Sequence, residues 1–541
     1  MFTSEPLGRA QMLARLRDAA IDGVDVVVVG AGITGAGVAL DAVTRGYRVL
    51  LVDRDDIASG TSSKSSKLVH GGLRYLQQGE TRLVAEALRE RRILMRNAPH
   101  LVEVLPFLLP ILTRDGLFPR RIARALGGAM WMYDMVGGWR IGRLHRRLRA
   151  TAAHRRCPTL DPERLAGAYL YFDATADDAR LTLDVARTAA ANGAIVLNHC
   201  PVTRIDVDTD GRISSVVLDT DDGPVVVPTR CVVNAAGVWA ERVDGLVADT
   251  MAGALPAVRI RPARGVHITV PWELVRNEIA VVLPVPGDRR SIFLVPDGPR
   301  SDGGFDVTYV GTTDTDHDAG IDSVECTPDD VAYLLRALNI NLDTVVGPEH
   351  VTGVWAGLRP LVESGDGTGH GPAAAGRTAD LSRRHRVDSS RSGLVRVIGG
   401  KLTTYRAMAA DTVDAVDGIL GGRRRCRTRR LRIQPVSPDV GAAIRAADPG
   451  LADPLAPGTD LCGADVIVAV RHELAGTLVD VMTRRHRGHL LNRAAAIAAA
   501  EGAAALLAAE LGWDRHRTED EIARYMALCD AEAAATGGTT R

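Results

Sequence analysis

Glycines at three spaced positions near the N-terminus predict a site for a dinucleotide. Gly30, Gly32 and Gly35 lie in GAGITG, between an apolar run that ends at residue 29 and a second run that ends on Asp53. In a strand–turn–helix–strand unit the first glycine allows the tight turn, the second lets the backbone approach a pyrophosphate, and the third lets helix and strand pack closely. The N–H groups at the helix N-terminus attract phosphates. We expect Asp53 to accept hydrogen bonds from the ribose hydroxyls.

Lysine is rare in this chain, and its positions draw attention to two further segments. Of 66 basic residues only three are lysine: Lys64 and Lys67 in SSKSSK, and Lys401 in GGKLTT. A compact, strongly hydrated ammonium suits a site where a planar guanidinium does not fit. Chance survival of a rare residue is the alternative. We favour a functional reason, because both segments lie in motifs that stand out on other grounds.

The elements that position these residues are predicted from apolar periodicity and turn signals. A helix over 181–192 leads to a strand over 194–197, and two hairpins turn at Asp210-Gly211 and Asp222-Gly223. Residues 255–320 are rich in strands, which predicts a largely antiparallel sheet that interrupts the α/β unit. The segment LVRVIGGKLTTYR then repeats the strand, glycine and helix pattern. Beyond about residue 440 the chain is rich in alanine and predicts a separate bundle of helices.

Length and composition exclude several classes of protein. The 541 residues suffice for two or three domains, and a formal net charge of zero gives no argument for nucleic acid. The seven cysteines form no CxxC pair, which argues against a zinc site or a disulfide framework and favours a reducing compartment. We expect neither a signal peptide nor a membrane-spanning helix, because the N-terminus has no apolar core and no apolar run reaches 18 residues.

Residues 114–156 differ in character from the rest of the chain. They contain eleven arginines and no lysine, interleaved with Phe118, Trp131, Trp139 and several methionines. A solvated basic face over ordinary core is one interpretation. The other is a surface that lies on anionic lipid, with arginines at the headgroups and apolar side chains below them.

The chain resembles the bacterial FAD-dependent sn-glycerol-3-phosphate dehydrogenases in six motifs: GAGITGAG, TSSKSSKLVHGGLRYL, NAAGVW, GTTD, GLRP and GGKLTTYR. These occur in matching order from about residue 22 to residue 420. Beyond 440 only HELAGTLVDVMTRRHR resembles the family. The resemblance implies FAD as cofactor, oxidation of glycerol 3-phosphate at C2 to dihydroxyacetone phosphate, and transfer of electrons to ubiquinone or menaquinone in a membrane.

The same resemblance assigns catalytic residues. The histidine of HGGLR falls on His70, the arginine of GxRP on Arg359, and the lysine of GGKLTT on Lys401. His70 is expected to remove the hydroxyl proton, a role typically associated with a rate factor of about 10²–10⁴; the alternative is a residue that only packs on the flavin. Arg359 is expected to bind phosphate, and Lys401 to stabilise charge that develops on the flavin. The substrate pocket is predicted to include Arg74, Tyr75, Arg383 and His267.

We predict an α/β fold in which a Rossmann-like FAD-binding domain (23–100, 180–245 and 350–420) is interrupted by a mainly antiparallel substrate domain (101–179 and 246–349). An N-terminal helix (1–22), a linker (421–438) and a C-terminal helical domain (439–541) complete the chain. The predicted cofactor contacts are Gly30, Gly32, Ile33, Thr34, Gly35, Asp53, Arg54, Thr61, Ser62, Ser63, Lys67, Leu68, His70, Gly71, Val202, Ala235, Ala236, Gly237, Trp239, Asp314, Gly400, Lys401, Leu402 and Thr403.

Three functions compete at this point. The first is a quinone-linked dehydrogenase that is cytoplasmic and attached peripherally to the inner face of the cell membrane, where its basic stretch lies on the anionic membrane surface. The second is an oxidase of the same substrate that uses O₂. The third is a flavin-binding regulatory module without turnover. The basic, aromatic stretch favours the first, and a base beside the flavin argues against the third. We expect no metal and no nucleic acid, and leave open a homodimer.

Overall fold

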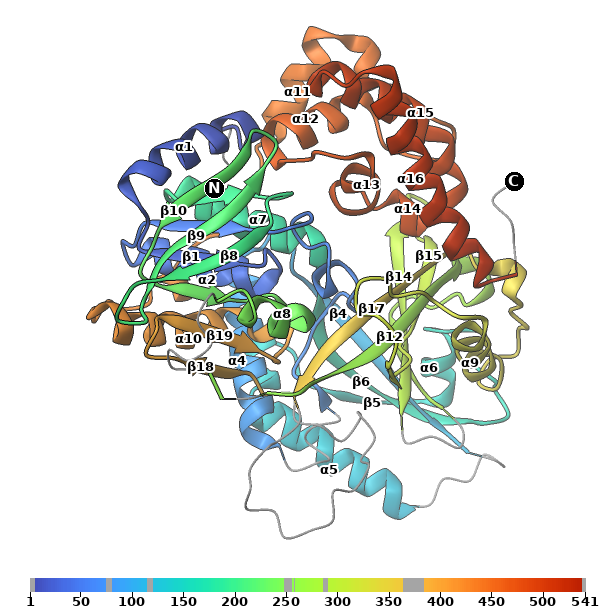
Figure 1. Cartoon of the computed structure of the whole chain (residues 1–541). Helices are drawn as coiled ribbons and strands as arrows, with labels where there is room; N and C mark the ends of the chain where they lie inside the picture. Colours follow the sequence, from blue (N-terminus) through green and yellow to red (C-terminus); the bar gives the residue numbers. More distant parts are fainter. Residues whose placement is uncertain are drawn as a thin grey trace.

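The structure, a computed structural model, describes residues 5–73, 80–113, 120–247, 255–256, 258–285, 290–362 and 384–537. Its first layer is a parallel sheet in the order β18-β19-β11-β1-β2-β7 (Figure 1). These strands span Arg386–Ser389, Leu394–Ile398, Val232–Asn234, Val26–Val29, Val49–Val52 and Ile195–Leu197. Among the described strands of this sheet, only β18 runs antiparallel to its neighbour. Both faces of β1 and β2 are buried, which explains their continuous aliphatic sequences.

Helices cover this sheet and fix the dinucleotide unit. α2 (Ile33–Thr44) connects β1 to β2 and packs against α7 (Asp178–Ala191) and α10 (Tyr405–Leu420). The α/β unit is therefore assembled from three separate stretches of the chain. α1 (Arg9–Asp22) packs on β10 through buried Met12 and Leu16. β8 (Val202–Val207), β9 (Ile213–Thr220) and β10 (Gly223–Pro228) form the two predicted hairpins.

A second, mainly antiparallel sheet stands beside the first. The described strands run β16-β12-β15-β14-β13-β4-β6-β3, with β17 paired to β12 and β5 to β6. They span Thr315–Asp316, Ile260–Pro271, Phe305–Gly311, Ser291–Pro299, Ala280–Pro284, Glu103–Leu112, Leu165–Thr175, Leu68–Val69, Gly353–Val362 and Arg146–Arg149. α9 (Pro328–Asn339) packs on this sheet through buried leucines.

One predicted domain boundary is wrong. The sequence places residues from 350 onward in the FAD-binding domain, but β17 pairs with β12 over ten residues, from Thr269↔Gly353 to Ile260↔Val362. That pairing makes β17 part of the antiparallel sheet, so the return to the parallel sheet comes at β18 and β19. A strand of mixed small and apolar residues fits either sheet, and only the partner strand decides.

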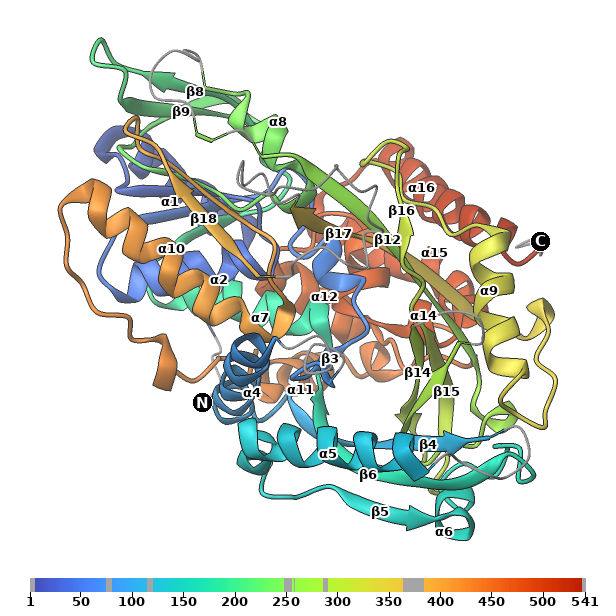
Figure 2. The same cartoon turned by 90° about the horizontal axis from the view of Figure 1, so that it is seen from below.

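A helical segment with an apolar exposed face lies along the second sheet. α4 (Thr81–Asn97) and α5 (Arg120–Val136) pack together, and Figure 2 shows α5 lying along β4 and β6. Met130 and Tyr133 point into the protein, whereas Trp131, Met135 and Trp139 are 51–78% exposed. The part of the predicted lipid-facing stretch at 114–119 lies outside the described residues.

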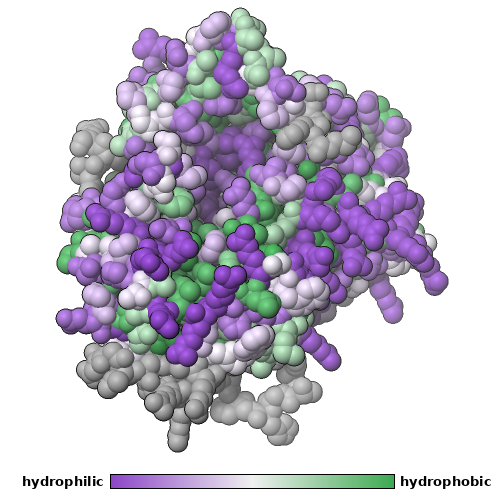
Figure 3. Space-filling model, turned by 180° about the vertical axis from the view of Figure 1, so that it is seen from behind, coloured by the Kyte–Doolittle hydropathy of each residue, from purple (hydrophilic) through white to green (hydrophobic). Residues whose placement is uncertain are grey.

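The C-terminal domain is helical, as predicted. The domain contains α11 (Pro438–Ala447), α12 (Gly463–Glu473), α13 (Leu478–Asp480), α14 (Gly488–Leu491), α15 (Arg493–Leu511) and α16 (Arg515–Ala534). α12, α13, α15 and α16 contribute to its alanine-rich core. By length and composition alone α15 could cross a membrane, but its buried alanines and Leu507 pack inside this core. Seen from behind, hydrophilic side chains line a hollow below the top of the molecule (Figure 3).

Candidate functional site

A cavity of about 530 Å³ lies between the two sheets and collects most of the predicted site residues. The turn after β1, the ends of β2 and β11, the loop at 59–66, and the middle of β12 and β17 all contribute to its wall. Among the predicted contacts it is lined by Gly30, Gly32, Ile33, Thr34, Asp53, Arg54, Thr61, Ser62, Leu68, His70, Val202, Ala235, Ala236, Gly237, Trp239, His267, Arg359, Gly400, Lys401, Leu402 and Thr403. Residues more than 300 positions apart thus face one space.

The glycine turn has the shape that a pyrophosphate requires. Gly30 has φ +103°, and a Cβ there would lie 2.8 Å from the carbonyl oxygen of Ala235. A Cβ on Gly35 would lie 1.8 Å from the carbonyl oxygen of Gly30, so this glycine allows close packing and does not itself line the cavity. Ser62 Oγ accepts the Ile33 N–H at 2.9 Å, which ties the serine loop to the N-terminus of α2. The turn therefore fits the phosphates of a dinucleotide.

Asp53 lies at the end of β2, where the ribose is expected. Its carboxylate accepts the N–H groups of Ala31 at 2.6 Å and Asp55 at 2.9 Å. Burial, opposed by these two bonds, raises the pKa of Asp53 to about 6. Beside it the Arg54 guanidinium stacks over the Trp239 ring at 5.0 Å. The carboxylate is thus placed to accept from a ribose hydroxyl.

A further part of the cavity wall contains both His70 and Lys401. Gly399 and Gly400 have φ +75° and +81°, and Lys401 precedes a short helical turn, η7 (Leu402–Thr404), that leads into α10. Thr403 Oγ1 accepts the His70 N–H at 3.2 Å, so the HGG and GGK segments are joined directly. The His70 ring meets Phe293 edge to face at 6.3 Å.

Arg359 and His267 form the wall on the antiparallel sheet. Arg359 Nη1 donates to Asp314 Oδ1 at 3.1 Å, and Nη2 donates to Thr312 Oγ1 at 3.0 Å. His267 stacks on Trp355 at 4.9 Å, and its Nε2 lies 2.8 Å from Ser66 Oγ. Burial and the positive charge of Arg359 hold the pKa of His267 well below its usual value, so this ring is neutral near pH 7.

Several predicted cofactor contacts do not line the cavity. Lys67 is buried in an ion pair with Asp178, with Nζ 2.9 Å from Oδ1, because its side chain turns away from the cavity. Asp314 instead neutralises Arg359. Ser63 is buried behind the loop, and the Gly71 N–H donates to Tyr133 Oη at 3.2 Å. Their effect on the site is indirect.

Three predicted substrate contacts, Arg74, Tyr75 and Arg383, lie outside the described residues. The cavity wall also contains residues that no sequence motif assigns to the site. Lys64, Ser66 and Phe293 line the cavity, and no described residue forms a hydrogen bond or ion pair with the Lys64 ammonium. The rarity of lysine was a signal for Lys64; nothing in the sequence marked Phe293.

Comparison with known proteins assigns the family. Residues 25–406 match the family described as FAD dependent oxidoreductase, and residues 437–518 match the C-terminal domain of alpha-glycerophosphate oxidase. Glycerol-3-phosphate dehydrogenase 2 of Mycobacterium tuberculosis is 35% identical over 97% of this chain and 91% of its own length. The mitochondrial glycerol-3-phosphate dehydrogenase of Arabidopsis thaliana is 33% identical over 96% of this chain and 88% of its own length.

A solved structure extends this agreement to the fold. The glycerol-3-phosphate dehydrogenase from Bacillus halodurans, complexed with FAD, superposes with a TM-score of 0.73 at 26% identity and covers 97% of both chains. The glycine turn, Asp53 and the GGK segment fit this cofactor. The chain belongs to the FAD-dependent oxidoreductases, within the glycerol-3-phosphate dehydrogenases, and its cofactor is FAD.

Proposed function

We propose that this protein oxidises sn-glycerol 3-phosphate at C2 to dihydroxyacetone phosphate and passes the electrons to a membrane quinone. The observation that carries the proposal is that His70, Arg359 and Lys401, from three separate elements, line one cavity together with the dinucleotide turn. We infer the substrate from the relatives, which are named glycerol-3-phosphate dehydrogenases. FAD, when bound, supplies the hydride acceptor.

Arg359 is proposed to bind the substrate phosphate. Its guanidinium is held in place by Asp314 and the Thr312 hydroxyl, so it is oriented before substrate arrives. Arginine presents parallel N–H groups that match phosphate oxygens. Lys64 lines the same cavity, where burial and the positive charge of Arg484 lower the pKa of its ammonium.

His70 is proposed to accept the proton of the C2 hydroxyl. Among the described residues two histidines line the cavity, but His267 is only 4% exposed and its Nε2 is engaged with Ser66. His70 is partly exposed, and its backbone is fixed by Thr403 next to Lys401. A base held in this way can remove the proton as the hydride leaves C2. Lys401 stabilises the negative charge that then develops nearby.

Anaerobic reduction tests this proposal. Purified protein should be yellow, and glycerol 3-phosphate should bleach the flavin absorbance without any added acceptor. Glycerol, which lacks the phosphate, should bleach it far more slowly at the same concentration. Protein that contains FAD but is not bleached by glycerol 3-phosphate would contradict the substrate assignment.

The electron acceptor is proposed to be a quinone reached by peripheral attachment to the inner face of the cell membrane. The exposed Trp131, Met135 and Trp139 within the arginine-rich stretch support this surface. Replacing these three side chains with serine should reduce binding to anionic vesicles, because the apolar anchors are lost, while flavin reduction continues. Val226→Ser and Val345→Ser, which change exposed apolar side chains elsewhere, serve as matched controls. Equal loss in the controls would refute the surface.

An oxidase that uses O₂ is the second candidate, favoured by the match to the C-terminal domain of alpha-glycerophosphate oxidase. Stopped-flow reoxidation of the reduced flavin separates the two candidates. The dehydrogenase should reoxidise faster with a soluble quinone analogue than with air-saturated buffer, and the oxidase should show the reverse order.

A further inference from the structure

The C-terminal domain contacts the cofactor loop through an arginine. Arg487 follows a π-helical turn, η10 (Val481–Arg485), in the segment DVMTRRHR. Its Nη2 donates to the carbonyl oxygen of Ser63 at 3.1 Å and to Asp178 Oδ1 at 3.2 Å. Its Nη1 donates to the Thr483 carbonyl at 3.0 Å, which fixes the guanidinium on its own domain. One side chain thus joins residues more than 420 positions apart.

Asp178, which Arg487 contacts, also binds two further residues of the loop, Ser65 and Lys67. The carboxylate is fully buried at the start of α7, and it accepts hydrogen bonds from the Ser65 N–H at 2.9 Å and the Ser65 hydroxyl at 2.7 Å. Lys67 Nζ donates to the same carboxylate at 2.9 Å. Two cations and two neutral donors together offset the cost of burying the negative charge of this carboxylate. Removal of one cation leaves that charge only partly compensated.

The front of the same loop faces the cofactor. Ser62 Oγ accepts the first N–H of α2, Ser66 Oγ bonds to His267, and Thr61 Oγ1 donates to the Leu358 carbonyl at 2.5 Å. These three residues line the cavity. The loop therefore has one side on the dinucleotide turn and the substrate sheet, and its other side on Asp178 and Arg487.

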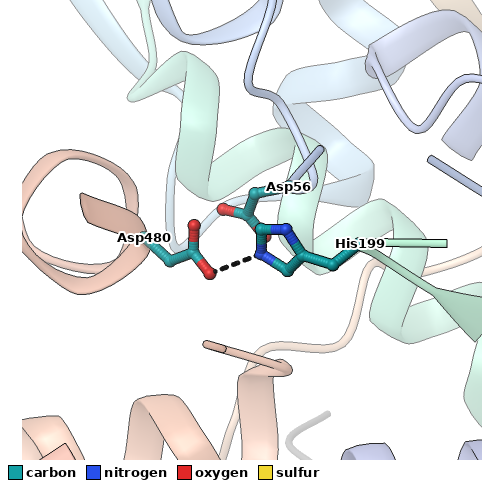
Figure 4. Close-up of side chains that lie close together, drawn as sticks. All are labelled: Asp56, His199 and Asp480. Atoms are coloured by element: carbon teal, nitrogen blue, oxygen red, sulfur yellow. Dashed lines mark hydrogen bonds and ion pairs between the residues drawn. The ribbon is translucent and has the colours of Figure 1, made fainter. Parts of the chain in front are cut away.

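A neighbouring group of Asp56, His199 and Asp480 has the spacing of a metal site (Figure 4). We do not propose a metal site here, because arginines already occupy these carboxylates. Arg485 binds Asp56 through both oxygens at 2.5 and 2.7 Å, and Arg484 bridges Asp56 and Asp480. His199 Nε2 lies 2.9 Å from Asp480 Oδ2. These ion pairs hold the C-terminal domain close to the loop, and Arg487 of the same domain contacts the loop itself.

We infer that Arg487 is a positioning residue for FAD: the C-terminal domain holds the loop at 61–67 in the shape that binds the cofactor. The inference rests on FAD as cofactor and not on the proposed substrate. Loss of the Arg487 contacts should let the loop sample other conformations, of which only a fraction binds FAD, so the apparent dissociation constant rises by the inverse of that fraction.

FAD titration of the apoprotein tests this inference, with flavin fluorescence as the readout. Arg487→Met in the full-length chain should raise the FAD dissociation constant by roughly tenfold, the scale of one lost charge-assisted hydrogen bond. Arg471→Met is the matched control, because Arg471 pairs with Glu510 inside the C-terminal domain and contacts no cavity residue. Its FAD affinity should stay within twofold of the parent.

Arg487→Lys and a double-mutant cycle separate positioning from plain stability. The lysine keeps a charge near Asp178 but cannot reach Ser63 as well, so its dissociation constant should lie between those of parent and Arg487→Met. Combined with Asp178→Asn, Arg487→Met should have a smaller effect than alone, because both act through one loop. A lower melting temperature with FAD affinity unchanged would overturn the inference. If Arg487→Met does not fold, an unchanged FAD affinity in Arg487→Lys overturns it equally.

Discussion

Replacement of Arg359 by lysine gives the sharpest test of the substrate site. The substitution keeps one positive charge beside Asp314 but removes the fork that reaches Thr312 and, as proposed, the phosphate. A hydrogen bond to a charged group contributes about 1.5–3 kcal/mol, so the loss of one phosphate contact should raise KM by roughly 10- to 150-fold. The limiting rate should fall only a few-fold, because the phosphate is bound equally in ground and transition states.

Single-turnover reduction of the flavin, measured anaerobically over a range of glycerol 3-phosphate concentrations, gives both quantities. Arg261→Lys is the matched control, because it alters a comparable ion pair, in which Arg261 lies 2.6 Å from Asp316. Arg261 lies on β12, the strand that pairs with the strand of Arg359, but it does not line the cavity. The control should change neither quantity. A limiting rate that falls more steeply than KM rises would refute the assignment, because it would mean that Arg359 acts mainly on the transition state.

Three further predictions concern Lys401, Asp53 and Tyr133. Lys401→Ala should lower the limiting rate of flavin reduction by roughly 10²–10³-fold with little change in substrate affinity, as expected for one preorganised donor; weaker binding with an intact rate would make it a phosphate ligand. The affinity for FAD should fall as the pH drops through about 6. Burial raises the pKa of Asp53 to about 6, and below that pH the protonated carboxyl group has lost its negative charge. Asp53→Asn should abolish this pH dependence, which is measured by FAD titration at each pH. Tyr133→Phe should destabilise the protein by about 1–3 kcal/mol in urea unfolding, because the Tyr133 hydroxyl donates to buried Asp173 at 2.7 Å and accepts from Gly71.

Local sequence was sufficient for the dinucleotide unit. Gly30, Gly32 and Gly35 are close in the chain, and their spacing constrains a turn whose shape depends on backbone conformation alone. The alternation of strands and hairpins likewise predicted β8 to β10, and the alanine-rich C-terminus predicted helices. These features depend on contacts within a few residues, which a pattern can encode.

Tertiary structure decided which way the side chains of the serine-rich loop point. Lys64 and Lys67 are three residues apart in one motif, yet Lys64 lines the cavity and Lys67 is buried against Asp178, with a positive φ of 57° that turns the backbone. The partner that stabilises Lys67 lies 111 positions away. Arg487 and Ser63 meet across 424 positions. The sequence by itself determined the elements and their turns; the direction of each charged side chain depended on which remote carboxylate or carbonyl folding placed beside it, because a buried charge requires a partner.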